Sequence, residues 1–203
     1  MEIIRHDWWA TPVWQFKLDS IDPQLVEHDC YNYERNRNDR MLLPNVAPGA
    51  ELNSSNFMLN LDWRTNDKYP AIRQMLFEVE KQAPNFYREM GVKKNFKQQL
   101  ENFWVNFNKP GMFNKPHLHP NSVFTGVYYA KAENNCGNIV IHNSSDKEFV
   151  LQTYTETQNQ YTMSNPQYRP SAGLVIIFPS WLQHSVESNY SGTDRISVSF
   201  HFN

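Results

Sequence analysis

From Leu100 to the end of the sequence, apolar residues recur mostly at every second position, in short runs. β-Branched and aromatic residues fill these runs, and clusters of Asn, Gly, Pro and Ser separate them. A period of two is typical of a strand with one buried face. A series of such strands predicts an antiparallel all-β sandwich or barrel. The predicted strands cover residues 100–108, 122–130, 137–142, 149–154, 174–178 and 195–202.

Two helices are predicted to pack on the outside of this core. Asp22 is a favourable N-cap and Pro23 a favourable first helical residue, and apolar residues then follow at helical spacing to about Arg35. A second amphipathic helix is predicted from Tyr69 to about Tyr87. Pro84 is expected to disturb the end of that helix.

The remaining segments point to a single domain. Residues 11–18 alternate apolar and polar side chains, which predicts a half-buried strand. Residues 36–66 have no clear period, apart from one expected strand near residues 57–61. This stretch and an insertion at residues 143–171 are expected to form walls of a substrate pocket. The chain has 203 residues, with no internal repeat and no linker, so one domain over residues 1–203 is predicted.

The charge balance argues against two classes of partner, and the cysteines indicate the compartment of the protein. The formal charge is -2, with 19 Lys and Arg against 21 Asp and Glu, which argues against nucleic acid or an anionic membrane as partner. Cys30 and Cys136 lie far apart and form no Cys-x-x-Cys motif, as expected for ordinary thiols in a reducing compartment. No apolar run is long enough for a signal peptide or a membrane span. We therefore predict a soluble, intracellular, cytoplasmic protein.

The segment at residues 114–120, Asn-Lys-Pro-His-Leu-His-Pro, carries two of the seven histidines. In extended backbone, His117 and His119 project to the same side. Pro116 and Pro120 fix their own φ angles and bias the residues before them towards extended backbone. A stiff, extended segment with two imidazoles on one side is half of a metal site.

The other half of the site is expected from a distant strand. His184 follows the apolar run at residues 174–178 and a Pro-Ser turn, so it stands near the end of a buried strand. Arg195 opens the last predicted strand, where it shares one face with Ser197 and Ser199. An arginine that points inward needs an anionic partner, and its planar guanidinium suits a carboxylate.

Taken in order, these motifs resemble those of a known enzyme class. The motifs are Pro116–Pro120, Gly126–Tyr129, Phe178–His184 and Arg195–Phe200. They resemble the Fe(II)- and 2-oxoglutarate-dependent dioxygenases, and more specifically a subgroup of 2-oxoglutarate–Fe(II) oxygenases found in bacteria and phages. The resemblance runs from about Phe103 to the end of the sequence. It implies a mainly β fold, a double-stranded β-helix of the jelly-roll or cupin-like kind, here with two flanking α-helices.

The resemblance also implies roles for individual residues. His117 and His184 match two histidine ligands of the metal, and His119 stands where the superfamily usually has an acid. Fe(II) would then be held by His117, His119 and His184, with 2-oxoglutarate as co-substrate. Arg195, helped by Ser197, matches the group that holds the distal carboxylate of 2-oxoglutarate.

Further contacts to the co-substrate are implied by the same resemblance. Either Tyr128 or Tyr129 would donate to that carboxylate, or both would only fill the barrel, and only one can donate because neighbours on a strand face opposite ways. We predict Tyr128. Asn106 is expected to contact co-substrate or product, and no catalytic side chain is expected beyond the metal site. Of the other histidines, His201 is the one expected nearest the site, and Trp104 and Trp181 are interpreted as filling the barrel interior.

The implied reaction is hydroxylation or oxidation of a substrate with release of succinate and CO2. The histidine at the usual acid position leaves a second reading open, a three-histidine cupin-type metal oxygenase that does not use 2-oxoglutarate. A third reading is a non-enzymatic jelly-roll module for binding or structure. The substrate is expected to be a small molecule or a peptide, in the host cytoplasm if the protein is phage-encoded, and a homo-oligomer is left open.

Overall fold

The computed structural model describes residues 11–35, 63–93, 95–142, 156–157, 159–160, 162–163 and 165–203. Two predicted strands, near residues 57–61 and at residues 149–154, lie outside these described residues. Most of the stretch at 36–66 and much of the insertion at 143–171 lie outside them as well.

The described residues form two antiparallel sheets and three helices. The five-stranded sheet has the order β1-β7-β4-β9-β2, and the four-stranded sheet has the order β3-β8-β5-β6. From β2 onward the chain passes between the sheets at almost every connection, which is the winding of a double-stranded β-helix. The elements in chain order are β1 (Trp14–Lys17), α1 (Pro23–Arg35), α2 (Pro70–Glu80), α3 (Ala83–Glu89), β2 (Leu100–Asn108), β3 (Asn114–His117), β4 (Phe124–Lys131), β5 (Ile139–Ile141), β6 (Gln167–Tyr168), β7 (Leu174–Pro179), β8 (His184–Val186) and β9 (Arg195–Phe202).

The second predicted helix is interrupted, which corrects the prediction of one helix from Tyr69 to Tyr87. Helix α2 ends at Glu80, and α3 begins at Ala83 with Pro84 in its first turn. Proline has no amide hydrogen to donate to the preceding turn, so it suits the start of a helix and breaks the interior of one. The flanking helices therefore number three among the described residues.

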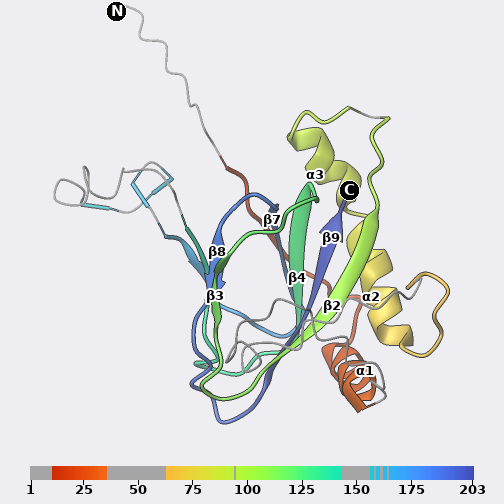
Figure 1. The fold of residues 1–203 in the computed structure, drawn as a ribbon, viewed down its shortest axis with the longest axis vertical. Helices are drawn as coiled ribbons and strands as arrows, with labels where there is room; N and C mark the ends of the chain where they lie inside the picture. The colour runs from red at the N-terminus through yellow and green to blue at the C-terminus, as the bar shows by residue number, and fades with distance from the viewer. Residues whose placement is uncertain are drawn as a thin grey trace, which may run out of the picture.

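The helices cover one face of the five-stranded sheet. Figure 1 shows α1, α2 and α3 on the side of this sheet that lies away from β3 and β8. The main apolar core fills the space under them and takes Tyr128 and Ala130 from β4 and Val198 and Phe200 from β9. A smaller apolar cluster, which includes Val127, lies on the inner face between the two sheets. The same strands therefore contribute one face to the core under the helices and the other face to the space between the sheets.

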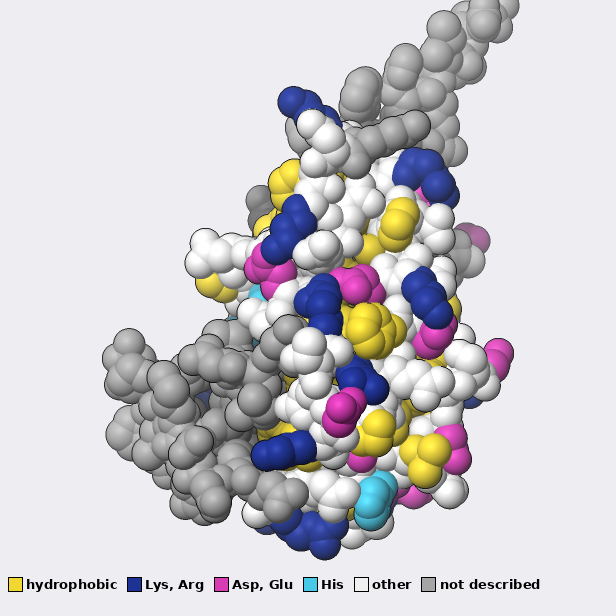
Figure 2. Space-filling view, turned by 90° about the vertical axis from the view of Figure 1, so that its right-hand side faces the viewer, with side chains coloured by type: hydrophobic (Ala, Val, Ile, Leu, Met, Phe, Trp, Pro, Cys, Tyr) yellow, Lys and Arg dark blue, Asp and Glu magenta, His cyan; other side chains and the backbone are white. Residues whose placement is uncertain are grey.

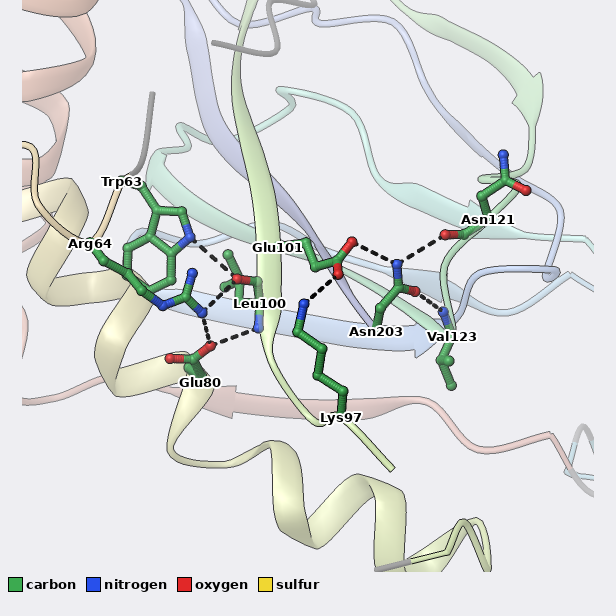
Figure 3. A network of polar contacts seen from close by, with 9 residues as sticks. All are labelled: Trp63, Arg64, Glu80, Lys97, Leu100, Glu101, Asn121, Val123 and Asn203. Carbon is green, nitrogen blue, oxygen red and sulfur yellow. Dashed lines mark hydrogen bonds and ion pairs between the residues drawn. The ribbon is translucent and has the colours of Figure 1, made fainter. Parts of the chain in front are cut away.

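One polar link joins α1 to α2, and a second joins α2 to the five-stranded sheet. The buried Asp29 of α1 accepts hydrogen bonds from the amides of Ala71 and Ile72, at 2.7 and 3.2 Å, and so satisfies the start of α2. At the other end of α2, Glu80 accepts a hydrogen bond from the amide of Leu100 at 2.7 Å, where β2 begins. Figure 3 shows this second link among the other polar contacts at the start of β2.

The surface carries charges of both signs. On the face drawn in Figure 2, basic and acidic side chains are interspersed, and hydrophobic side chains are scattered among them. Both cysteines are free and buried. Among the described residues, no helix combines the length and the apolar character needed to cross a membrane.

Candidate metal centre

Three histidines meet between the two sheets. His117 ends β3 and His184 begins β8, and the antiparallel pairing of these strands sets the two residues opposite each other. His119 lies in the loop after β3, where its amide donates to the carbonyl of Ser180 at 3.0 Å. One ligand atom from each histidine lies within 4.8 Å of the other two. The extended segment predicted to present two imidazoles on one side therefore does so.

Backbone carbonyls fix the tautomers of two of these rings. Nδ1 of His117 lies 2.7 Å from the carbonyl oxygen of Lys115, and Nδ1 of His184 lies 3.0 Å from that of Leu182. A carbonyl can only accept, so each Nδ1 carries the hydrogen and each Nε2 keeps its lone pair. Backbone support of this kind is what orients metal-binding histidines in proteins.

Burial keeps the three rings uncharged. Burial, together with smaller contributions from His184, His117 and His201, lowers the pKa of His119 to about 2. Burial also lowers the pKa of His184 to about 3, with a smaller contribution from His117. The pKa of His117 is lowered by burial as well, which its hydrogen bond to Lys115 partly offsets. Neutral imidazoles are the form that binds metals.

The donor set fits a first-row metal ion such as Fe(II). The Nε2 atoms of His119 and His184 lie 3.2 Å apart. That separation allows one ion to bind both nitrogens at the usual metal–imidazole distance of about 2.1 Å. Imidazole is a ligand that iron accepts. His117, His119 and His184 can therefore hold the ion together.

A cavity of about 300 Å³ surrounds the three rings. Most of its apolar lining comes from β4, β5, β7 and β8, and most of its polar lining other than the metal-binding histidines comes from β2 and β9. Its lining comprises Trp104, Asn106, Asn108, Asn114, His117, His119, Thr125, Gly126, Val127, Tyr129, Ile139, Phe178, His184, Val186, Arg195, Ser197, Ser199 and His201.

Arg195 is buried in this cavity with one donor group unused. Its side chain is 1% exposed, and its Nη1 donates to the carbonyls of Cys136, Gly137 and Glu187. Its Nη2 is buried and has no partner. A buried guanidinium N–H group without an acceptor destabilises the fold, and a bound carboxylate would supply that acceptor.

A row of polar side chains from β2 and β9 lines the cavity beside Arg195. In the β2–β9 ladder, Asn108 pairs with Arg195 and Asn106 with Ser197. The side-chain Nδ2 of Asn106 donates to the hydroxyl of Ser199 at 2.9 Å and to that of Ser197 at 3.4 Å. The predicted residues Asn106, Ser197 and Arg195 are therefore brought together in the cavity.

The prediction of Tyr128 as a cavity residue is wrong. Tyr128 is fully buried in the helix-side core, and its hydroxyl has no partner. Tyr129 lines the cavity instead. Burial raises the pKa of Tyr129, and the nearby Arg195 partly offsets this. Alternate side chains of β4 point to opposite faces of the sheet, and the face of Tyr129 is the one that borders the cavity.

One further histidine and one tryptophan lie beside the three metal-binding rings. The ring of His201 lies 4.9 Å from that of His119 and 4.7 Å from that of Trp104, which confirms the expectation that His201 lies near the site. The period of two along β9 is the signal that finds it. Trp104 lines the cavity, but Trp181 is 61% exposed, so its interpretation as barrel filling is wrong.

Comparisons with known proteins agree with this arrangement. Residues 102–201 match the model of a family described as "Putative 2OG-Fe(II) oxygenase". All the described residues that line the cavity fall within the matched range. No curated protein matches the chain.

Solved structures match over nearly the whole chain at low sequence identity. A prolyl-4-hydroxylase from Pseudomonas putida is 15% identical, with 96% of this chain and 89% of that chain covered and a TM-score of 0.58. AviO1 from Streptomyces viridochromogenes Tue57 is 10% identical, with 95% and 89% covered and a TM-score of 0.56.

A shorter match joins this chain to an oxidoreductase of the 2OG-Fe(II) oxygenase family from Burkholderia pseudomallei. It covers 64% of this chain and 57% of that chain, at 14% identity and a TM-score of 0.48. The two longer matches confirm the predicted double-stranded β-helix. The match over residues 102–201 shows that the chain belongs to this family of 2OG-Fe(II) oxygenases.

Proposed function

We propose that this chain is an Fe(II)- and 2-oxoglutarate-dependent dioxygenase that oxidises an organic substrate and releases succinate and CO2. The observation that carries the proposal is one cavity that holds three convergent, neutral imidazoles and a buried arginine with a free donor. Family membership supports it independently.

The imidazoles of His117, His119 and His184 would hold Fe(II) through Nε2. The carbonyls of Lys115 and Leu182 keep two of these rings in the required tautomer. When bound, Fe(II) and 2-oxoglutarate supply the oxidising chemistry, in which one atom of O2 enters the substrate and the other enters succinate.

The other cavity residues would bind and orient the co-substrate. The free Nη2 of Arg195 would donate to the distal carboxylate of 2-oxoglutarate, with the Tyr129 hydroxyl as a second donor. Asn106 and Ser197 would contact the same molecule from β2 and β9. Apolar side chains from β4, β5, β7 and β8 would exclude water from the reacting groups.

A small molecule or a peptide side chain is the substrate class that we propose. The cavity, at about 300 Å³, is of a size that binds small ligands. The net charge of -2 gives no electrostatic reason to favour nucleic acid.

Anaerobic calorimetry would test the proposal. We expect 2-oxoglutarate to bind the Fe(II)-loaded protein and not the metal-free protein. Arg195→Met should weaken this binding by tenfold or more, because a carboxylate–arginine pair contributes about 1.5–3 kcal/mol. Arg169→Met changes an exposed arginine outside the cavity and is the matched control. Absence of 2-oxoglutarate binding to the metal-loaded wild-type protein would sink the proposal.

A second candidate is a three-histidine metal oxygenase that does not use 2-oxoglutarate. The observation that favours it is His119, which gives the site a third imidazole in place of an acid. This candidate predicts that Arg195→Met leaves oxygen-dependent activity and co-substrate affinity almost unchanged. The two candidates are therefore separated by the same variant.

A further inference from the structure

A fully buried serine joins the two segments that carry the metal ligands. Ser180 lies in the turn between β7 and β8, four residues before His184, and its side chain is 0% exposed. Its amide donates to the carbonyl of Val123 at 3.0 Å, and its carbonyl accepts from the amide of His119 at 3.0 Å. Both backbone groups thus bind the loop that follows β3.

The side chain of Ser180 adds two further bonds to the same loop and to β4. Its Oγ lies 2.6 Å from Oγ of Ser122 and 2.7 Å from Oγ1 of Thr125. We call Ser122, Thr125 and Ser180 the hydroxyl cluster. Ser122 donates to Ser180, and the bond between Ser180 and Thr125 can run in either direction, so two hydrogen bonds link the three hydroxyls through Ser180.

The far side of the loop is held as well. Figure 3 shows Asn203, at the end of β9, bonded both to the carbonyl of Asn121 and to the amide of Val123. Asn121 adopts a left-handed conformation with φ of 63°. The loop from His119 to β4 is therefore fixed against β9 on one side and against the hydroxyl cluster on the other.

A buried polar cluster of this kind serves geometry more than stability. Apolar groups of the same shape could fill such a space at little loss of folding free energy, whereas a satisfied hydrogen-bond network selects one arrangement. The arrangement selected here relates His119 to His184, which are 65 residues apart in sequence and have their Nε2 atoms at 3.2 Å. A metal ion requires that separation to be reproduced closely.

We propose that Ser180, through the hydroxyl cluster, is a positioning residue that sets the separation of His119 and His184 for metal binding. This inference rests on the metal centre of the proposed function. It assigns to Ser122, Thr125 and Ser180 a role in metal geometry and not in contact with the metal.

Titration of the metal-free protein with Co²⁺, followed by visible absorption, tests the proposal. The d–d bands of Co²⁺ report coordination geometry, and their growth gives the affinity. Ser180→Ala keeps both backbone bonds and removes the central hydroxyl. We expect it to lower Co²⁺ affinity about 10–100-fold and to change the band pattern, as loss of a supporting hydrogen bond around metal ligands does.

Ser191→Ala is the matched control. Its hydroxyl bonds Asn189 at 2.6 Å and the carbonyl of Thr193 at 2.9 Å, in a loop whose residues do not line the cavity. It should leave Co²⁺ affinity and spectrum unchanged. If Ser180→Ala fails to fold by circular dichroism, Ser122→Ala replaces it, and the same direction of change is expected with a smaller size.

The outcomes separate this inference from the proposed function. A wild-type protein that does not bind Co²⁺ overturns both. Wild-type binding together with an unchanged affinity and spectrum in the serine variants overturns the positioning role alone. Wild-type binding that is weakened and spectrally altered in Ser180→Ala, and unaffected in Ser191→Ala, supports both.

Discussion

At the scale of single residues, the function of a side chain in this protein depends on which way its strand position faces. Tyr128 and Tyr129 are neighbours of the same type, both almost fully buried. The first packs under the helices and the second lines the cavity near Arg195. Only the second can reach a ligand bound there. This pair therefore provides a controlled comparison with one chemical change at two adjacent positions.

We expect Tyr129→Phe to weaken 2-oxoglutarate binding severalfold, because it removes a donor that would face the carboxylate. We expect Tyr128→Phe to leave binding unchanged and the free energy of unfolding equal or higher, since its buried hydroxyl has no partner. Calorimetry and urea unfolding measure the two effects. Equal loss of binding in both variants would contradict this assignment.

The lowered pKa of His184 makes a prediction about stability. The folded pKa of about 3 lies below the unfolded value of about 6.5. Between these values the unfolded state binds the proton and the folded state does not, so the free energy of unfolding falls as pH is lowered through this window. Above about pH 6.5 both states are neutral and the effect is absent.

Urea unfolding of the metal-free protein between pH 8 and pH 5 measures this. We expect the wild-type protein to lose stability below about pH 6.5. Below about pH 6.5, the slope of the free energy of unfolding against pH should be lower in His184→Gln by about 1.4 kcal/mol per pH unit, the value for one proton. A wild-type slope in His184→Gln would refute the argument.

At the scale of elements, the connection between β4 and β5 shapes the surroundings of Arg195. The carbonyls of Cys136 and Gly137 both accept from its Nη1. Gly137 has a φ of 86°, and a Cβ there would lie 2.3 Å from the carbonyl oxygen of Glu187, the third acceptor. The absence of a side chain at this position is what lets the connection close over the arginine.

Gly137→Ala is therefore expected to displace the Glu187 backbone and the guanidinium that it holds. We expect a loss of stability of about 1–3 kcal/mol and weaker 2-oxoglutarate binding. The matched control is Gly192→Ala, since a Cβ at Gly192 meets nothing within 4 Å and its φ is ordinary. If both variants behave alike by urea unfolding and calorimetry, the close contact at Gly137 does not matter.

At the scale of the whole molecule, the five-stranded sheet separates stability from chemistry. Its outer face carries the core under the helices, and its inner face carries the cavity. Ile196 and Ser197 show the division on adjacent positions of β9, the first in the core and the second in the cavity. Folding and ligand binding should therefore be separable by mutation.

We expect Ile196→Ala to lower the free energy of unfolding by about 2–5 kcal/mol, because it leaves a cavity in the core. Its affinity for Co²⁺ and 2-oxoglutarate, measured under conditions where it stays folded, should be unchanged. Ser197→Ala should show the reverse pattern, with weaker 2-oxoglutarate binding and little loss of stability. Parallel losses in both variants would mean that the two faces are not independent.

Sequence patterns predicted the elements with a strong period and missed those without one. The bounds of α1, β2 and β9 were predictable because apolar and polar positions contrast along them. Strands β6 and β8 have two and three residues, too few to show a period. The single long helix was wrong because Pro84 starts a new helix instead of ending one.

Within the candidate site, the histidines and Arg195 were predictable, because their order along the chain resembles a known family. Tyr128 was chosen wrongly because β4 is buried on both faces, so polarity does not tell which face is the cavity. The sequence therefore does not tell which of Tyr128 and Tyr129 points into the cavity. The carbonyls around Arg195 were not predictable, since backbone acceptors leave no mark in a sequence.

The pairing of β9 with β2 also limits how the length of the chain can change in evolution. Deletion or insertion of one residue within Arg195–Phe202 would turn every later side chain to the opposite face. Apolar residues would then enter the cavity while serines entered the core, so that one event would remove both the site and the fold. A two-residue change would restore the faces but move a side chain about 6.8 Å along the strand. We therefore expect functional relatives to vary in length within their loops and to keep this strand free of insertions.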